Sequence, residues 1–121
     1  MEKTRGKVIA LWVLRVLVGL AFLGSGGAKL AGAPAMVAIF TKIGLGQGVR
    51  ILTGVLEVIG AVGLFIPRYT FYAALLLAAV MLGAVGFHLT ILGGNPAAPI
   101  VLLLLSGLIA WLSRNTAERA A

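Results

Sequence analysis

The sequence predicts an all-α integral membrane protein, a four-helix bundle with a short amphipathic helix between its first two spans. The composition predicts this class, because hydrophobic residues make up 61% of the 121 residues and charged residues only 11%. The mean hydropathy of +1.14 agrees with this. An ordinary soluble domain is about 25% charged, and a chain this small leaves much of its surface uncovered. The composition therefore excludes a soluble globule, and the length predicts a single membrane domain over residues 1–121.

Four apolar runs come close to the length of about 20 helical residues that a bilayer core requires. Their expected boundaries are 8–28, 49–66, 70–92 and 97–112. Pro34 separates the first two runs and Pro67 the next two. Asn95 is expected as the N-cap of the fourth helix, with Pro96 at its first helical position. The fourth run is short, so flanking residues are expected to extend it.

A shorter helix is predicted at about residues 34–44. Met36, Ile39, Phe40 and Ile43 follow the spacing i, i+3, i+4 and i+7, and Lys42 lies on the opposite side. This spacing is typical of an amphipathic helix that lies in the membrane interface. The alternative is an irregular loop packed on the mouth of the bundle, because apolar stretches of this length are ambiguous.

Basic residues predict the orientation of the chain, since positive residues favour the cytoplasmic side of a membrane. Four spans place both termini on one side, and that side carries six of the nine basic residues nearest the membrane ends: Lys3, Arg5, Lys7, Arg68, Arg114 and Arg119. The opposite side carries Lys29, Lys42 and Arg50. We therefore expect a multi-pass protein of the inner (plasma) membrane with cytoplasmic termini.

Charge and composition also limit the function. The net charge of +7 suits lipid headgroups rather than nucleic acid, because the basic residues flank apolar runs. The absence of cysteine excludes disulfide relays and thiolate ligands. One histidine and one central glutamate do not make a coordination set, so no metal site is expected.

Three ionisable residues fall well inside the predicted spans, away from their ends, namely Arg15, Glu57 and His88. A charge at the bilayer centre costs about 2.5–3.5 kcal/mol on insertion scales, so such residues usually face the bundle and pair. Counted from the middle of each span, Arg15 lies about 6 Å from the midpoint, within reach of Glu57. We therefore expect a buried Arg15–Glu57 pair, which either serves function or only locks helix register.

The same depth estimate predicts a polar chamber open toward the outside. His88 lies about 10 Å outward of its helix midpoint, and Ser25 and Thr53 fall between it and Glu57. Lys29 would complete the chamber from the outer end of the first span. The fourth span contributes only Ser106, so it is expected to face lipid or a second copy in a homodimer.

The first three spans resemble the DoxX family of small four-span membrane proteins. The resemblance is carried by residues 15–30 (RVLVGLAFLGSGGAKL), residues 54–60 (GVLEVIG) followed by Gly63 and Leu64, and residues 81–84 (MLGA) together with His88. Founding members of that family are membrane subunits linked to a thiosulfate:quinone oxidoreductase. Others are associated with oxidative-stress complexes or act as accessory membrane factors. The resemblance implies that Arg15, Lys29, Glu57 and His88 are functional positions.

The leading hypothesis is accordingly a membrane subunit of a quinone-linked oxidoreductase. His88 and Glu57 would exchange protons with the quinone while Arg15 keeps Glu57 ionised. The expected lining of the quinone site is Ser25, Lys29, Thr53 and Met81. The chain itself shows no cofactor motif, so a redox partner subunit would supply the electrons.

Two further hypotheses use the same features. A non-catalytic scaffold or chaperone would anchor a partner protein in the membrane, and a small transporter or proton conductor would use the polar chamber. Lys29, Lys42 and Arg50 are expected to attract anions, either a substrate such as thiosulfate or lipid headgroups.

Overall fold

The structure is a computed structural model that describes the backbone of residues 2–120 and the side chains of residues 5–115. The side chains of Lys3 and Arg119, used in the orientation argument, lie outside the described residues. The described residues form helices joined by short turns, with no strand among them, and the elements are α1 (Glu2–Ala31), α2 (Pro34–Ile43), α3 (Gln47–Leu64), α4 (Thr70–Phe87), η1 (His88–Leu92) and α5 (Ala97–Ala120). The predicted all-α class is confirmed.

Within the described residues, four helical segments are long and apolar enough to cross a membrane: Arg5–Ala31, Gln47–Leu64, Thr70–Leu92 and Ala97–Asn115. The fourth segment extends beyond the predicted run of 97–112, as was expected because that run is short for a membrane span. The Asn95 carboxamide oxygen accepts a hydrogen bond from the Ala97 backbone N–H at 2.9 Å. Asn95 thus satisfies an otherwise free N–H at the start of α5, although the helix begins at Ala97 rather than at Pro96.

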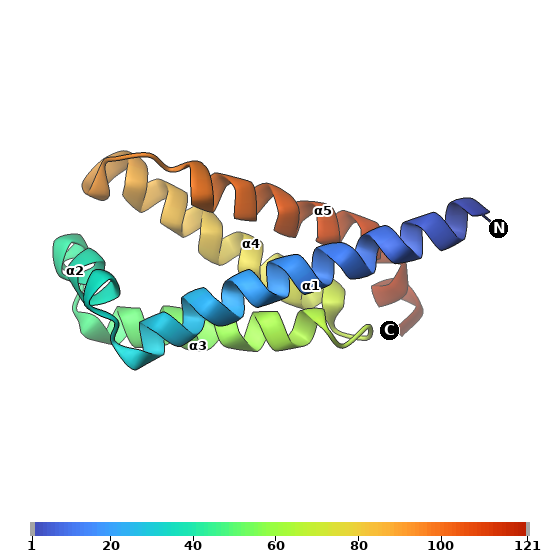
Figure 1. Cartoon of the computed structure of the whole chain (residues 1–121), viewed down its shortest axis with the longest axis horizontal. Helices are drawn as coiled ribbons and strands as arrows, with labels where there is room; N and C mark the ends of the chain where they lie inside the picture. The colour runs from blue at the N-terminus through green and yellow to red at the C-terminus, as the bar shows by residue number, and fades with distance from the viewer. Residues whose placement is uncertain (1, 121) are drawn as a thin grey trace.

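The four long helices form two pairs (Figure 1). α1 packs antiparallel to α3, α4 packs antiparallel to α5, and contacts of α3 with α4 and of α1 with α5 join the pairs. The pairs lie close together at the end of the bundle that carries both termini, and they diverge toward the end that carries α2. Both termini therefore lie at one end of the bundle, and the side of the membrane that this end faces remains a prediction.

The apolar core fills the bundle between the two pairs. Its largest fully buried members are Phe22 from α1, Leu64 from α3, Leu77 from α4 and Ile109 from α5. The outer faces of the same helices expose large apolar side chains, as expected for helices that face lipid. The bilayer is thus the environment that the surface requires.

The fourth span differs from the prediction that it faces only lipid or a second copy. Ser106, Ile109 and Ser113 of α5 are fully buried against the bundle, whereas Leu104 and Trp111 on the same helix are exposed. The sequence did not show which side of this span faces the bundle, because it has few polar residues and a membrane helix can be apolar both where it faces lipid and where it faces its neighbours. α5 therefore belongs to the core of the bundle as well as to its surface.

α2 confirms the predicted amphipathic helix, and its setting at the membrane interface remains a prediction. Phe40 and Ile43 are buried, and the helix ends at Gly44, whose φ of 83° is the left-handed conformation that glycine adopts most easily. Lys42 donates from Nζ to the Leu92 carbonyl oxygen at 2.9 Å, which ties α2 to the end of η1. α2 is thereby held across the end of the bundle where the helix pairs diverge.

Candidate functional site

A cavity of about 430 Å³ lies between the two helix pairs at the end covered by α2. Its volume is within the range of about 300–1,000 Å³ that is typical of small-molecule sites. Most of its lining is apolar and comes from all six helical elements. The polar side chains of the lining are Ser25, Lys29, Thr53, Glu57, His88 and Asn95. The cavity thus combines apolar walls with a few convergent polar groups, which is the usual composition of a ligand site.

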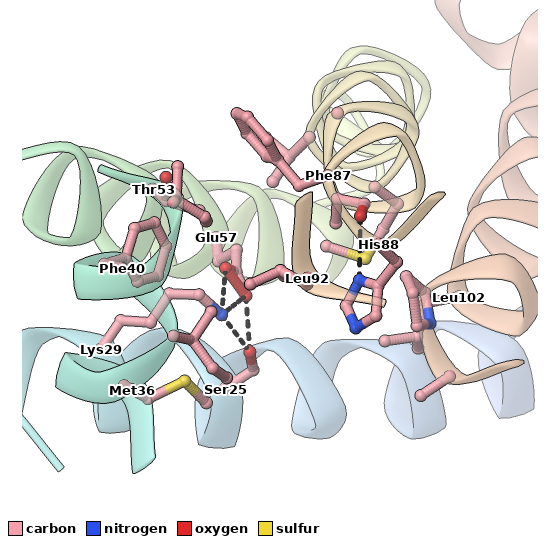
Figure 2. A pocket seen from close by; sticks show the side chains of 18 of the residues that line it. Ser25, Lys29, Met36, Phe40, Thr53, Glu57, Phe87, His88, Leu92 and Leu102 are labelled. Carbon is pink, nitrogen blue, oxygen red and sulfur yellow. Dashed lines mark hydrogen bonds and ion pairs between the residues drawn. The ribbon is translucent and has the colours of Figure 1, made fainter. Parts of the chain in front are cut away.

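The strongest polar feature of the cavity is a cluster of Ser25, Lys29 and Glu57 (Figure 2). The Lys29 ammonium lies 2.9 Å from Glu57 Oε2 and donates to Oε1 at 3.1 Å. It also donates to Ser25 Oγ at 2.7 Å, and the Ser25 hydroxyl in turn donates to Glu57 Oε1 at 2.7 Å. Glu57 is fully buried and the Lys29 side chain is 11% exposed. The cluster is therefore a buried ion pair with a bridging hydroxyl.

The local register of α1 against α3 builds this cluster. Ser25 and Lys29 are four residues apart, so they lie on one face of α1. On this face Gly26 meets Gly54 of α3: a Cβ added to Gly26 would lie 2.9 Å from the Gly54 carbonyl oxygen and 3.1 Å from Glu57 Cβ. Only glycine allows the two backbones to approach this closely. The close approach places Glu57 directly beside the polar face of α1.

The predicted Arg15–Glu57 pair is wrong, because Glu57 pairs with Lys29. Arg15 is 4% exposed, its guanidinium stacks on Trp12 at 4.4 Å from the ring centroid, and its Nε has no hydrogen-bond partner. The prediction measured each residue from the middle of its own span, but the contact of Gly26 with Gly54 shows that the middles of the two spans do not lie opposite each other. With Gly26 opposite Gly54, Arg15 lies nearer the terminal end of the bundle than Glu57.

His88 lies at the junction of α4 and η1 and projects into the cavity (Figure 2). Its Nδ1 lies 2.9 Å from the Ala84 carbonyl oxygen, which fixes the orientation of the ring. His88–Leu92 forms a π-helical segment, which the sequence analysis did not predict. Such segments are rare and often occur at functional sites.

The structure brings most of the predicted site residues into one place. Six of them line this cavity: Ser25, Lys29, Thr53, Glu57, Met81 and His88. Thr53 donates from its hydroxyl to the Val49 carbonyl oxygen at 2.7 Å, and Met81 is buried. Arg15, the remaining predicted catalytic residue, does not line the cavity.

The expected group of anion-attracting residues does not form one cationic patch. Lys42 donates to the Leu92 carbonyl oxygen, and Arg50 donates to the Lys29 carbonyl oxygen and, at 2.8 Å, to Gln47 Oε1. Lys29 itself is paired with Glu57. The sequence predicted that these three residues lie at one end of the bundle. It did not show that backbone carbonyls, an amide oxygen and a carboxylate at that end would take up their hydrogen bonds and charge.

Several lining residues were missed by the sequence analysis. Met36, Ile39, Phe40 and Ile43 of α2 cover the cavity, and their helical spacing was recognised but interpreted as a face buried in lipid. Ala98, Pro99 and Leu102 of α5 also line it. No pattern in the sequence distinguishes these α5 residues, because lipid and cavity walls favour the same apolar side chains.

Metal binding has no support among the residues whose side chains are described, since no three His, Asp or Glu side chains gather there.

The fold and the cavity agree with the comparison to known families. A family model described as the DoxX-like family matches residues 13–112. No curated protein and no solved structure matches the chain. Because the matched region is well over half of the chain and includes every residue that lines the cavity, the chain belongs to the DoxX-like family.

Proposed function

We propose that this protein is a membrane subunit of a quinone-linked oxidoreductase and that the cavity holds the quinone ring. The observation that carries the proposal is a buried Lys29–Glu57 pair that faces an otherwise apolar cavity together with His88. Ionisable residues inside a membrane span are costly and usually mark a functional site. A quinone ring fits this environment, because its ring is apolar and its two oxygens are polar.

The polar residues of the cavity can carry the protons that accompany quinone chemistry. Interconversion of a quinone and a quinol moves two electrons and two protons. His88 lines the cavity, and histidine is the side chain that most often acts as a general acid or base in proteins. Glu57 forms its ion pair with the Lys29 ammonium, the partner that Arg15 was expected to be. A redox partner subunit would exchange the electrons, and by family resemblance thiosulfate is the donor we propose.

The buried apolar core favours a binding site over a transmembrane conduit. Toward the terminal end of the bundle the helices next contribute Phe22, Leu64 and Leu77, all fully buried and apolar. A proton path requires polar groups or water along its length. These three side chains present neither, which supports a binding site, while the buried polar residues Thr70, Ser106 and Ser113 lie elsewhere among the packed helices and do not line the cavity.

The proposal is tested by filling the cavity. Ala84 lines it from α4, and Leu82 of the same helix is 63% exposed on the lipid-facing side. Ala84→Phe and Leu82→Phe variants, purified from native membranes in mild detergent, are compared with the unchanged protein for total quinone plus quinol per mole of protein. We expect Ala84→Phe to lose the bound quinone and Leu82→Phe to keep it. Equal quinone in all three preparations, at the level of bulk lipid, would contradict the proposal.

A further inference from the structure

We propose, on the basis of the proposed function, that the cavity opens sideways into the bilayer between α3 and α4, beside Gly83, and that the isoprenoid chain of the bound quinone leaves through this opening. The quinone ring would lie in the cavity, and the chain would lie in the hydrocarbon of the membrane. The ligand is thus a quinone with a long apolar chain, and the gap beside Gly83 is the route of that chain.

The packing of α3 against α4 changes along the two helices. Near the terminal end, a Cβ added to Gly60 would lie 2.6 Å from the Leu77 side chain, and a Cβ added to Gly63 would lie 2.8 Å from Ala73 Cβ. Further along α4, a Cβ added to Gly83 would meet no atom within 4 Å. The two helix pairs diverge in the same direction (Figure 1). The helices therefore touch at one end of their interface and leave open space at Gly83.

Gly83 lies at the edge between the cavity side and the lipid side of α4. It lines the cavity and is also exposed, while the preceding residue, Leu82, is 63% exposed on the lipid side. Val80, Gly83 and Phe87 line the cavity at the spacing i, i+3 and i+7, so they share this edge of the helix. Figure 2 shows Phe87 on the side of α4 toward Thr53 of α3. The cavity thus reaches the surface of the bundle on the α3 side of α4.

The depth of Gly83 shows which environment this opening meets. Gly83 lies near the middle of the span Thr70–Leu92, more than about 10 Å from either end. The other exposed residues of the lining lie at the end of the bundle that carries α2, and they are Ile39, Asn95 and Ala98. Because the hydrocarbon core of a bilayer is about 30 Å thick, the opening at Gly83 faces hydrocarbon rather than water.

An apolar chain is the occupant that fits this opening. A cavity of about 430 Å³ has the volume of a site for a small molecule, so it can hold a quinone ring but not a long isoprenoid chain as well. The chain needs an exit, and α2 covers the cavity at the other end with Phe40 and Ile43 buried. A polar headgroup at the depth of Gly83 would be costly, because hydrocarbon offers it no hydrogen bonds. An apolar chain has no such cost.

The test compares Gly83→Phe with Gly86→Phe in phosphatidylcholine nanodiscs, using the full chain. Gly86 is the matched control, since it is exposed on the same helix and has no neighbour within 4 Å of an added Cβ, but does not line the cavity. The probes are a benzoquinone without a chain and the same ring with a long isoprenoid chain. Each probe is compared between proteins in the same lipid, so its partition into lipid cancels.

Gly83→Phe should weaken binding of the chain-bearing quinone at least about tenfold, because the phenyl ring occupies the path of the chain, and should change binding of the chainless quinone by less than about twofold. Gly86→Phe should leave both affinities unchanged. An unchanged affinity of Gly83→Phe for the chain-bearing quinone, an equal loss for both probes, or the same loss in Gly86→Phe overturns the inference.

Photolabelling of the unchanged protein gives a second measurement that needs no variant to fold. The probe is the chain-bearing quinone with a diazirine on the isoprene unit next to the ring. We expect the label on residues 49–56 of α3 and 80–87 of α4, whereas label on α1 and α5 overturns the inference. The outcomes also separate the two proposals. A chainless quinone that binds and is displaced by Ala84→Phe, with the chain labelling α1 and α5, contradicts only the route. No binding of either probe contradicts the proposed function and the inference together.

Discussion

Lys29 and Glu57 meet across the interface of α1 and α3, with the lysine Nζ 2.9 Å from the carboxylate Oε2. The two residues are 28 positions apart in the chain, and the loop that joins their helices includes α2. The ion pair that lines the cavity therefore depends on how α1 is aligned along α3. A buried pair of this kind is a weak source of net stability, but the loss of one partner is costly because the other remains charged in a low-dielectric site.

Lys29→Met is therefore expected to destabilise the protein by about 3–5 kcal/mol, the usual result of leaving one member of a buried ion pair. The measurement is unfolding in detergent followed by circular dichroism. Lys42→Met is the matched control, since Lys42 is exposed and binds only a backbone carbonyl. A loss for Lys29→Met no larger than that for Lys42→Met would show that the pair does not form.

Double-mutant cycles distinguish the observed partner of Glu57 from the one that the sequence predicted. The pair Lys29→Met and Glu57→Gln should show a coupling energy of about 0.5–3 kcal/mol, because the side chains are in contact. The pair Arg15→Met and Glu57→Gln should be additive within about 0.5 kcal/mol. A strong coupling of Arg15 to Glu57 would contradict the register described here.

The close approach of α1 and α3 predicts unequal effects of two neighbouring glycine substitutions. A Cβ at position 26 would lie 2.9 Å from a backbone carbonyl oxygen, whereas a Cβ at position 27 has no neighbour within 4 Å. Gly26→Ala should destabilise by about 1–3 kcal/mol through overpacking. Gly27→Ala should be neutral or stabilising by up to about 1 kcal/mol, because alanine favours the helix. Thermal unfolding of both variants is the measurement, and equal effects would contradict the packing.

The orientation can be tested with single cysteines, since the chain has none of its own. Leu45 follows α2 and is 62% exposed, and Tyr69 lies between α3 and α4 and is 50% exposed. If both termini are cytoplasmic, a membrane-impermeant maleimide added to intact cells should label Leu45→Cys and leave Tyr69→Cys unlabelled until the cells are opened. The reverse pattern would place the termini outside and the cavity at the cytoplasmic end.

The composition and the spacing of apolar residues were sufficient for the architecture. The four spans, the helix near residues 34–44 and the capping role of Asn95 depend on local rules: a span must match the bilayer, a helix needs its 3.6-residue period, and a helix end needs acceptors. The polar residues of the cavity were also recognisable one by one, because ionisable and hydroxyl side chains are rare inside membrane spans.

The partners of those residues were decided only by the tertiary structure. A sequence states the depth of a residue within its own helix, but pairing depends on how far one helix slides along another and on how it is rotated. Gly26 and Gly54 set that register, and it directs Lys29 rather than Arg15 to Glu57. The π-helical turn at His88 and the apolar cover that α2 forms over the cavity were likewise visible only in the structure. The sequence alone determined a membrane bundle with charges that had to be neutralised, and the packing of its helices selected which charge neutralises which.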